Sequence, residues 1–200
     1  VPALHLLANL GWRYMGAAEC MVMRGGTREV LLKPRLIEVL KSRRFDYKGE
    51  RYPLSPSAID QIVRELSALP LGDGPVVANE RLYQLLALGI TVTEFMPDGK
   101  KHQPTIPVID WTDPTANLWD ITEECEVLSV QGTHHRTPDI VGYVNGLPLV
   151  VIEAKRPESG HAGKAMVTEG ISQHLRNQRQ DEIPQLFGYA QLLLSISLTE

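Results

Sequence analysis

The chain is poor in cysteine and has no long hydrophobic run, which argues against a disulfide-rich protein and against a membrane-spanning one. Cys20 and Cys125 are the only cysteines among 200 residues, too few for a disulfide framework and suited to a reducing cytoplasm. No apolar run reaches the roughly 18 residues that a membrane-spanning helix requires, and the N-terminus lacks the basic and apolar segments of a secretion signal. We therefore expect a cytoplasmic protein that does not span a membrane and whose two thiols are buried.

The chain also lacks an excess of basic residues, a phosphate-binding loop and an initial methionine. Its 20 Lys and Arg against 24 Asp and Glu give a net charge of −4, whereas non-specific nucleic-acid binders are usually basic overall. No Gly-x-x-x-x-Gly-Lys-Ser/Thr sequence occurs, so this chain alone should not hydrolyse ATP. Because the chain starts without methionine and within a helix-like segment, we expect a fragment of a longer protein.

The charged residues are distributed unevenly. Residues 24–51 hold nine basic side chains against four acidic ones, while residues 110–126 hold six acidic side chains and no Lys or Arg. The basic segment either binds phosphates through counterion release or forms a solvated helix face. Under the first alternative, Arg43 and Arg44 are candidate DNA contacts.

The spacing of apolar residues predicts helices up to about residue 89. Pro34 opens one helix at its first position. The pair Ser55-Pro56 predicts the N-cap and first turn of a second, and Asn79 predicts the cap of a third that ends at Leu88.

After residue 90, short apolar or alternating stretches predict strands. They lie at 90–95, 106–111, 124–130, 140–144, 147–152 and 186–197, with a polar helix at about 164–178. Asn145-Gly146 is a strong hairpin signal between two of these strands. The order predicts an α/β or α+β fold with a mixed central sheet flanked by helices. Residues 1–89 would form a mainly helical part and residues 90–200 the core, both within one structural domain.

Charged residues follow the most apolar of these strands. Glu153 and Lys155 lie on one face because side chains repeat every two residues along a strand. Asp139 adds a second carboxylate near the same end of the hairpin. Two close carboxylates repel each other, and a divalent cation relieves that repulsion. Oxygen ligands of this kind suit Mg²⁺ and phosphate chemistry, in which Lys155 could orient or deprotonate the attacking water.

The register of the hairpin decides whether this site can form. A strict two-residue turn at Asn145-Gly146 places Asp139 opposite Ile152, so that Asp139 would point away from Glu153. The site therefore requires a bulge, a three-residue loop or an irregular strand start at Pro138.

The residues around this hairpin resemble a known family. Pro138-Asp139 followed by Glu153-Ala154-Lys155 is similar to the PD-(D/E)xK nuclease signature. The Asn-Gly-Leu-Pro-Leu segment resembles the nuclease domain of the restriction (R, HsdR) subunit of type I restriction-modification enzymes. The resemblance covers nearly the whole chain, including Leu10-Gly11-Trp12, Ile109-Asp110-Trp111 and residues 183–189.

This resemblance implies a restriction-endonuclease-like fold and cleavage of double-stranded DNA with Mg²⁺, for which Mn²⁺ can substitute. It also implies an ATP-dependent translocase elsewhere in the subunit, with methylation and specificity subunits as partners. Asp139, Glu153 and the carbonyl of Ala154 match the metal ligands of the family, and Lys155 matches its catalytic lysine.

The family also carries a Gln-x-x-x-Tyr motif on the helix after these residues. Gln173 matches the glutamine and is therefore a candidate site residue, but Asn177 stands at the tyrosine position. Gln185 and Tyr189 have the same spacing further along the chain. The acidic residue that is usual on the first helix of this superfamily would precede Val1.

Arg136 and Arg176 are candidate contacts to DNA phosphates, while His134 and His135 are expected to be exposed or to face phosphate. Two other functions compete with a type I restriction endonuclease. One is a non-catalytic docking domain of the same complex, and the other is a repair nuclease or resolvase of the same superfamily.

Overall fold

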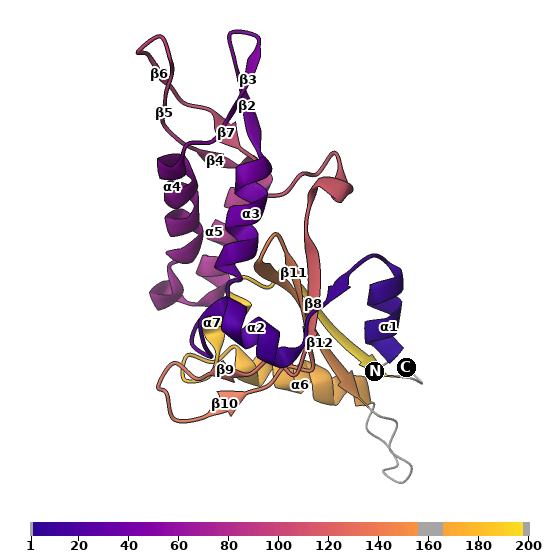
Figure 1. The fold of residues 1–200 in the computed structure, drawn as a ribbon. Coiled ribbons are helices and arrows are strands. Elements are labelled where there is room, and N and C mark those ends of the chain that lie inside the picture. Colours follow the sequence, from indigo (N-terminus) through magenta and orange to yellow (C-terminus); the bar gives the residue numbers. More distant parts are fainter. Residues whose placement is uncertain (1, 156–165, 198–200) are drawn as a thin grey trace.

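A computed structural model describes residues 2–155 and 166–197 of the chain (Figure 1). Its centre is a five-stranded mixed sheet in the order β1-β8-β11-β12-β13. The edge strands run parallel to their neighbours, and β8, β11 and β12 are antiparallel. The strands are β1 (Arg13–Tyr14), β8 (Trp119–Glu123), β11 (Ile140–Val144), β12 (Leu147–Lys155) and β13 (Leu192–Ser197). This mixed sheet with flanking helices confirms the predicted α/β fold class.

Helices cover both faces of the sheet. On one face α1 buries Leu4 against Ile121, Ile140 and Ile152. On the other, Val141 and Val151 join the main core with the remaining helices, because neighbouring residues of a strand face opposite sides. The helices are α1 (Pro2–Asn9), α2 (Ala17–Arg24), α3 (Lys33–Ser42), α4 (Pro56–Ser67), α5 (Pro75–Leu88), α6 (Met166–Asn177) and α7 (Pro184–Phe187), with 3-10 turns η1 (Leu71–Asp73) and η2 (Pro114–Ala116).

Short antiparallel pairs extend from this body. Three of them form the end of the molecule away from α6, and the β9–β10 pair lies at the α6 end (Figure 1). They pair β2 (Arg44–Tyr47) with β3 (Glu50–Pro53), β4 (Ile90–Thr91) with β7 (Thr105–Ile106), β5 (Glu94–Phe95) with β6 (Lys101–His102), and β9 (Val127–Leu128) with β10 (His135–Arg136). None of the helices in the described part of the chain is long and apolar enough to cross a membrane.

The predicted helix starts are confirmed at two positions and wrong at a third. Pro34 lies in the first turn of α3, and the Ser55 hydroxyl accepts a hydrogen bond from the Ala58 amide at 3.2 Å. Helix α5 begins at Pro75 instead of after Asn79. The Asn79 side chain instead donates to the Ala190 carbonyl at 2.7 Å, so it joins α5 to the segment before β13.

Three strand predictions also need correction. The stretch predicted as a strand from Leu186 begins with helix α7, and the strand itself starts only at Leu192. A short apolar run has no clear period, so the buried pair Leu186-Phe187 does not distinguish a helix from a strand. The strand predicted at 106–111 ends at Ile106, and the one predicted at 124–130 is limited to β9.

Strand β8 was missed because Asp120 and Glu123 make its sequence look exposed, although Asp120 is completely buried. The helix predicted at about 164–178 is found as α6, while Lys164 lies outside the described residues.

Candidate active site

A β-bulge in the β11–β12 hairpin sets the position of the two predicted carboxylates. Near the turn, Val144 pairs with Leu147 and Tyr143 with Pro148, as a strict two-residue turn requires. Beyond Tyr143 the register shifts by one residue, so that Gly142 pairs with Val150 and Ile140 with Ile152. This shift puts Asp139 opposite Glu153, on the same face of the sheet. The bulge that the site requires is therefore present.

Gly142 stands directly at this register shift. A Cβ added there would lie 2.9 Å from the Trp12 ring and 3.1 Å from the Val150 Cβ, so no larger residue fits without movement. Trp12 is held in turn by an edge-to-face contact with Trp119, with ring centroids 5.1 Å apart. The close approach of Trp12 to the bare backbone of Gly142 helps to define the bulge.

The turn of the hairpin is fixed by the Asn145 side chain. Its oxygen accepts from the Leu118 amide, and its amide group donates to the Val108 carbonyl and to Asn117 Oδ1, all at 2.8 Å. Asn145 has a φ of 53° and Gly146 a φ of 82°, as a type I′ turn requires. Both ends of the hairpin are therefore anchored, and the bulge between them sets the register at Asp139.

The carboxylates and Lys155 converge at the end of the hairpin. Asp139 Oδ2 accepts a hydrogen bond from the Ala154 amide at 2.8 Å, and Lys155 Nζ lies 3.5 Å from Glu153 Oε2. The Glu153 side chain is only 3% exposed. Burial, and then the neighbouring Asp139 carboxylate, raise the pKa of Glu153 to about 7. Three predicted site residues thus meet at one place.

Helix α6 covers this place. Gly170 packs so closely that a Cβ there would clash with Ser195 and lie 3.3 Å from the Glu153 Cβ. Gln173 follows one turn later, and its Oε1 is buried without a hydrogen-bond partner among the described residues. His174 on the same helix shares a 2.9 Å hydrogen bond with the Leu194 carbonyl, and burial lowers its pKa. Gln173 lies one turn after Gly170 on this helix, and its role beside the carboxylates stays a prediction.

The donor set fits a hard divalent cation. The described residues contain no group of three or more His, Cys, Asp or Glu side chains that could hold a metal ion. Asp139 and Glu153 supply carboxylate oxygens instead, and the Ala154 carbonyl of the same strand can supply a third. Mg²⁺ takes one or two carboxylates and retains several waters, so a third side-chain ligand is not needed. The unpartnered Gln173 oxygen adds an acceptor suited to such a water.

Arg136 lies in an ion pair that the sequence did not predict. Its Nε and Nη2 donate to the two carboxylate oxygens of Glu182, each at 2.6 Å. His134 Nε2 lies 2.8 Å from the same carboxylate. Arg136, and then His134, lower the pKa of Glu182 to about 2. Arg136 remains 30% exposed, and its contact with DNA stays a prediction.

Of the other three predicted DNA contacts, only Arg176 lies on an element that packs against Glu153. Arg43 is buried and donates to Asn117 Oδ1 at 3.1 Å, with Asp110 at 3.5 Å. Arg44 is exposed on β2, at the end of the molecule opposite to α6 (Figure 1). Arg176 is partly exposed in the last turn of α6. Their contacts with DNA stay predictions.

Gln185 and Tyr189, which form the second Gln-x-x-x-Tyr sequence, donate hydrogen bonds to backbone carbonyls of distant segments. The buried Tyr189 hydroxyl donates to the Leu66 carbonyl at 2.7 Å, and Gln185 Nε2 donates to the Leu128 carbonyl at 2.8 Å. Burial raises the pKa of Tyr189. Asn177, at the tyrosine position on α6, is buried, and its carbonyl accepts from the Ile183 amide at 3.1 Å.

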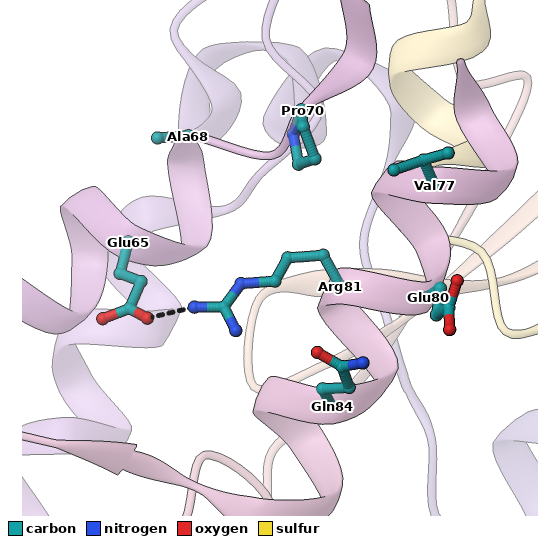
Figure 2. A pocket seen from close by; sticks show the side chains of 7 residues that line it. All are labelled: Glu65, Ala68, Pro70, Val77, Glu80, Arg81 and Gln84. Carbon is teal, nitrogen blue, oxygen red and sulfur yellow. Dashed lines mark hydrogen bonds and ion pairs between the residues drawn. The ribbon is translucent and has the colours of Figure 1, made fainter. Parts of the chain in front are cut away.

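A pocket of about 530 Å³ lies away from these residues, between α4 and α5 (Figure 2). Arg81 and Glu65 form an ion pair of 2.8 Å within it. Its lining contains no residue of β11, β12 or α6, so it is separate from the carboxylate site. The lining residues are Glu65, Ala68, Pro70, Val77, Glu80, Arg81 and Gln84.

The chain is similar in sequence to known proteins over nearly its whole length. Residues 1–200 match the family described as the type I restriction enzyme R protein N terminus. The chain is 30% identical over 196 residues to the type I restriction enzyme HindI endonuclease subunit of Haemophilus influenzae. It is 25% identical over 199 residues to the putative type I restriction enzyme MjaIXP endonuclease subunit of Methanocaldococcus jannaschii. Each match covers 96% of this chain but only 17% of the relative.

Proposed function

The chain belongs to the family of type I restriction enzyme R protein N termini, and we propose that it is the Mg²⁺-dependent DNA endonuclease domain of such a subunit. Support comes from the relatives, which are named as endonuclease subunits, and from the convergence of Asp139, Glu153 and Lys155. The bulge after Gly142 is the observation that carries the proposal, because without it Asp139 would face away from Glu153.

In this proposal Asp139, Glu153 and the Ala154 carbonyl hold the metal ion, with Mn²⁺ as a substitute for Mg²⁺. The bound ion would relieve the repulsion between the two carboxylates, acidify a water molecule and stabilise negative charge on the phosphoryl oxygens. The Ala154 amide orients Asp139 through its 2.8 Å hydrogen bond. Burial of Glu153 excludes bulk water from one side of the site and strengthens electrostatic interactions there.

Lys155 and Gln173 act on the water and the phosphate. The Lys155 ammonium group neutralises charge that develops on the phosphate, and its position beside Glu153 keeps it close to the reacting atoms. Gln173 Oε1 accepts a hydrogen bond from the attacking water and so orients it. Water then attacks the phosphorus in line with the leaving sugar oxygen and loses a proton to solvent, the bond between that oxygen and phosphorus breaks, and the leaving oxygen takes up a proton from solvent.

The substrate is double-stranded DNA. Arg136 and Arg176 are proposed to contact its phosphates near the scissile bond, and Arg43 and Arg44 belong to the basic segment 24–51. ATP would be used by a motor elsewhere in the full-length subunit, and the methylation and specificity subunits would select the DNA. We place this assembly in the cytoplasm, and residues 90–200 contain the proposed nuclease core.

Plasmid cleavage by the assembled enzyme tests this proposal. We expect Glu153→Gln and Lys155→Met in the full-length subunit to abolish DNA cleavage with Mg²⁺ and ATP while ATP hydrolysis continues. Glu80→Gln, an exposed carboxylate on α5, is the matched control and should cleave normally. If both site variants cut DNA at the rate of the unchanged enzyme, the chain is a docking domain and the nuclease lies elsewhere.

A further inference from the structure

Both cysteines of the chain meet at one buried tyrosine. Cys20 lies on α2, Cys125 follows β8, and each Sγ is 3.7 Å from the Tyr143 hydroxyl oxygen. The two sulfur atoms are therefore no more than 7.4 Å apart. Cys20 is 1% exposed, Cys125 2% and Tyr143 0%. The sequence predicts burial of the thiols correctly, but their separation by more than a hundred positions hides the pairing.

A buried arginine lies beside these thiols. Arg24 is 4% exposed, and among the described residues it donates to the carbonyls of Glu29 at 3.1 Å and Glu126 at 2.8 Å and to no carboxylate. Its Nε has no hydrogen-bond partner among the described residues. A buried cation without a counter-charge is costly. Arg24 and Cys20 share the buried face of α2 because they are four residues apart.

The electrostatics favour a thiolate at Cys20. A hydrogen bond from the Cys125 thiol, and the nearby Tyr143 and Arg24, lower the pKa of Cys20 to about 6 against the opposing effect of burial. Burial and the neighbouring Cys20 raise the pKa of Cys125. The pair therefore divides into an attacking thiolate and a protonated partner, the division that thiol–disulfide exchange requires.

We propose that Cys20 and Cys125 form a redox-active dithiol that closes to a disulfide by exchange with a small-molecule disulfide. The Cys20 thiolate attacks one sulfur of the small disulfide, whose sulfur–sulfur bond breaks and releases a thiolate that takes up the Cys125 proton. The Cys125 thiolate then attacks the Cys20 sulfur of the mixed disulfide and releases the second small thiolate, which takes up from solvent the proton that Cys20 had lost. Two protein thiols are oxidised, and one small disulfide is reduced to two small thiols.

The bond would form next to the segment that carries Asp139. The Cys125 amide donates to the Pro138 carbonyl at 3.2 Å, and Tyr143 directly follows the register shift at Gly142. Helix α2 is the element that would open to admit the reagent, because it is only eight residues long and its Val22 side chain is 82% exposed. A short surface helix opens locally more readily than the sheet beneath it.

Peptide mapping after exposure to oxidised glutathione tests the proposal on the folded full-length subunit. We expect the peptides with Cys20 and Cys125 to be recovered joined and lighter by two hydrogen atoms, with reversal by dithiothreitol. In Cys125→Ser, Cys20 should retain a glutathione adduct, whereas in Cys20→Ser, Cys125 should remain a free thiol.

Two controls separate this chemistry from unfolding. Far-ultraviolet circular dichroism must match before and after oxidation, and Tyr143→Phe, which keeps the buried ring, should still form the bond. Recovery of both cysteines as free thiols after overnight incubation would overturn the proposal. Recovery as two separate glutathione adducts would overturn it equally, since the thiols would then be too far apart to join.

Discussion

The central sheet contains two buried carboxylates in opposite electrostatic environments. Asp120 on β8 has a completely buried side chain, and it receives Arg13 Nε at 2.6 Å and Arg35 Nε at 2.9 Å. Glu153 on β12 is almost as buried at 3%, but Lys155 approaches only to 3.5 Å and Asp139 is a like-charged neighbour. Both carboxyl groups are buried, but only the negative charge of Asp120 is fully balanced by neighbouring cations.

This difference separates Asp120, which holds parts of the fold together, from Glu153, for which we propose a role in function. The two arginines more than neutralise Asp120, and they tie β1 and α3 to β8. Glu153 has no such compensation, and burial raises its pKa to about 7. A fold does not need a poorly compensated carboxylate in its interior, and this supports the proposal that a cation binds at Glu153.

The largest expected effect is the loss of DNA cleavage when the Glu153 site loses a charge. Asp139→Asn keeps a side-chain oxygen that can accept from the Ala154 amide, so the hairpin should stay intact. Loss of the metal-binding charge should remove several kcal/mol of transition-state stabilisation, about 10³-fold in rate. Single-turnover plasmid cleavage by the assembled enzyme measures this loss. A variant that cleaves within a few-fold of the unchanged enzyme would remove Asp139 from the site.

The next largest effect is a loss of folding stability when Asp120 loses its charge. Asp120→Asn keeps the size of the side chain but leaves Arg13 and Arg35 facing a neutral group, at an expected loss of about 3–5 kcal/mol. Urea unfolding measures the change, with the exposed Asp60→Asn on α4 as the control. Stability equal to that of the control would show that the buried ion pairs do not hold β1 and α3 to the sheet.

The sequence predicted most of the Glu153 site because its signals are local. Alternation along one strand places Glu153 and Lys155 on one face, and Asn145-Gly146 marks the turn that brings Asp139 near. Counting residues across the turn also shows that the hairpin needs a bulge, a three-residue loop or an irregular strand start at Pro138. It does not locate the bulge, which lies between Gly142 and Tyr143.

The Asp120 region could not be predicted in the same way. Arg35 and Asp120 are 85 positions apart, and Arg136 and Glu182 are 46 apart. No local pattern indicates which distant charges will meet. The acidic residues of 110–126 gave no sign of a buried strand, because compensation of Asp120 by Arg13 and Arg35 becomes visible only in the folded chain. Local signals therefore identified the carboxylates of the proposed site, whereas long-range pairing, as at Asp120, is visible only in the folded chain.

A smaller change in folding stability, of opposite sign, is expected when Glu153 loses its charge. Glu153→Gln should stabilise the metal-free chain at pH 8 by about 1–3 kcal/mol, because it removes a buried charge beside Asp139. Urea unfolding in the presence of a chelator measures the gain. Asp120→Asn, which moves stability in the other direction, serves as the internal contrast. Loss of stability in Glu153→Gln would mean that the ion pair with Lys155 outweighs the burial of the charge.

The smallest effect is a pH dependence at a third carboxylate, which resembles Asp120 more than Glu153. Hydrogen bonds from Arg136, and then His134, lower the pKa of Glu182 to about 2 in the folded chain, against 4.5 without them. Since the pKa is lower in the folded chain, the stabilisation of the fold by the Glu182 carboxylate is complete above pH 4.5 and is lost as the pH falls towards 2. Its size should be on the order of 1 kcal/mol, because Arg136 is partly exposed to screening water. Glu182→Gln should flatten this part of a stability–pH curve measured by urea unfolding, and an unchanged slope would show that the pair contributes nothing to folding.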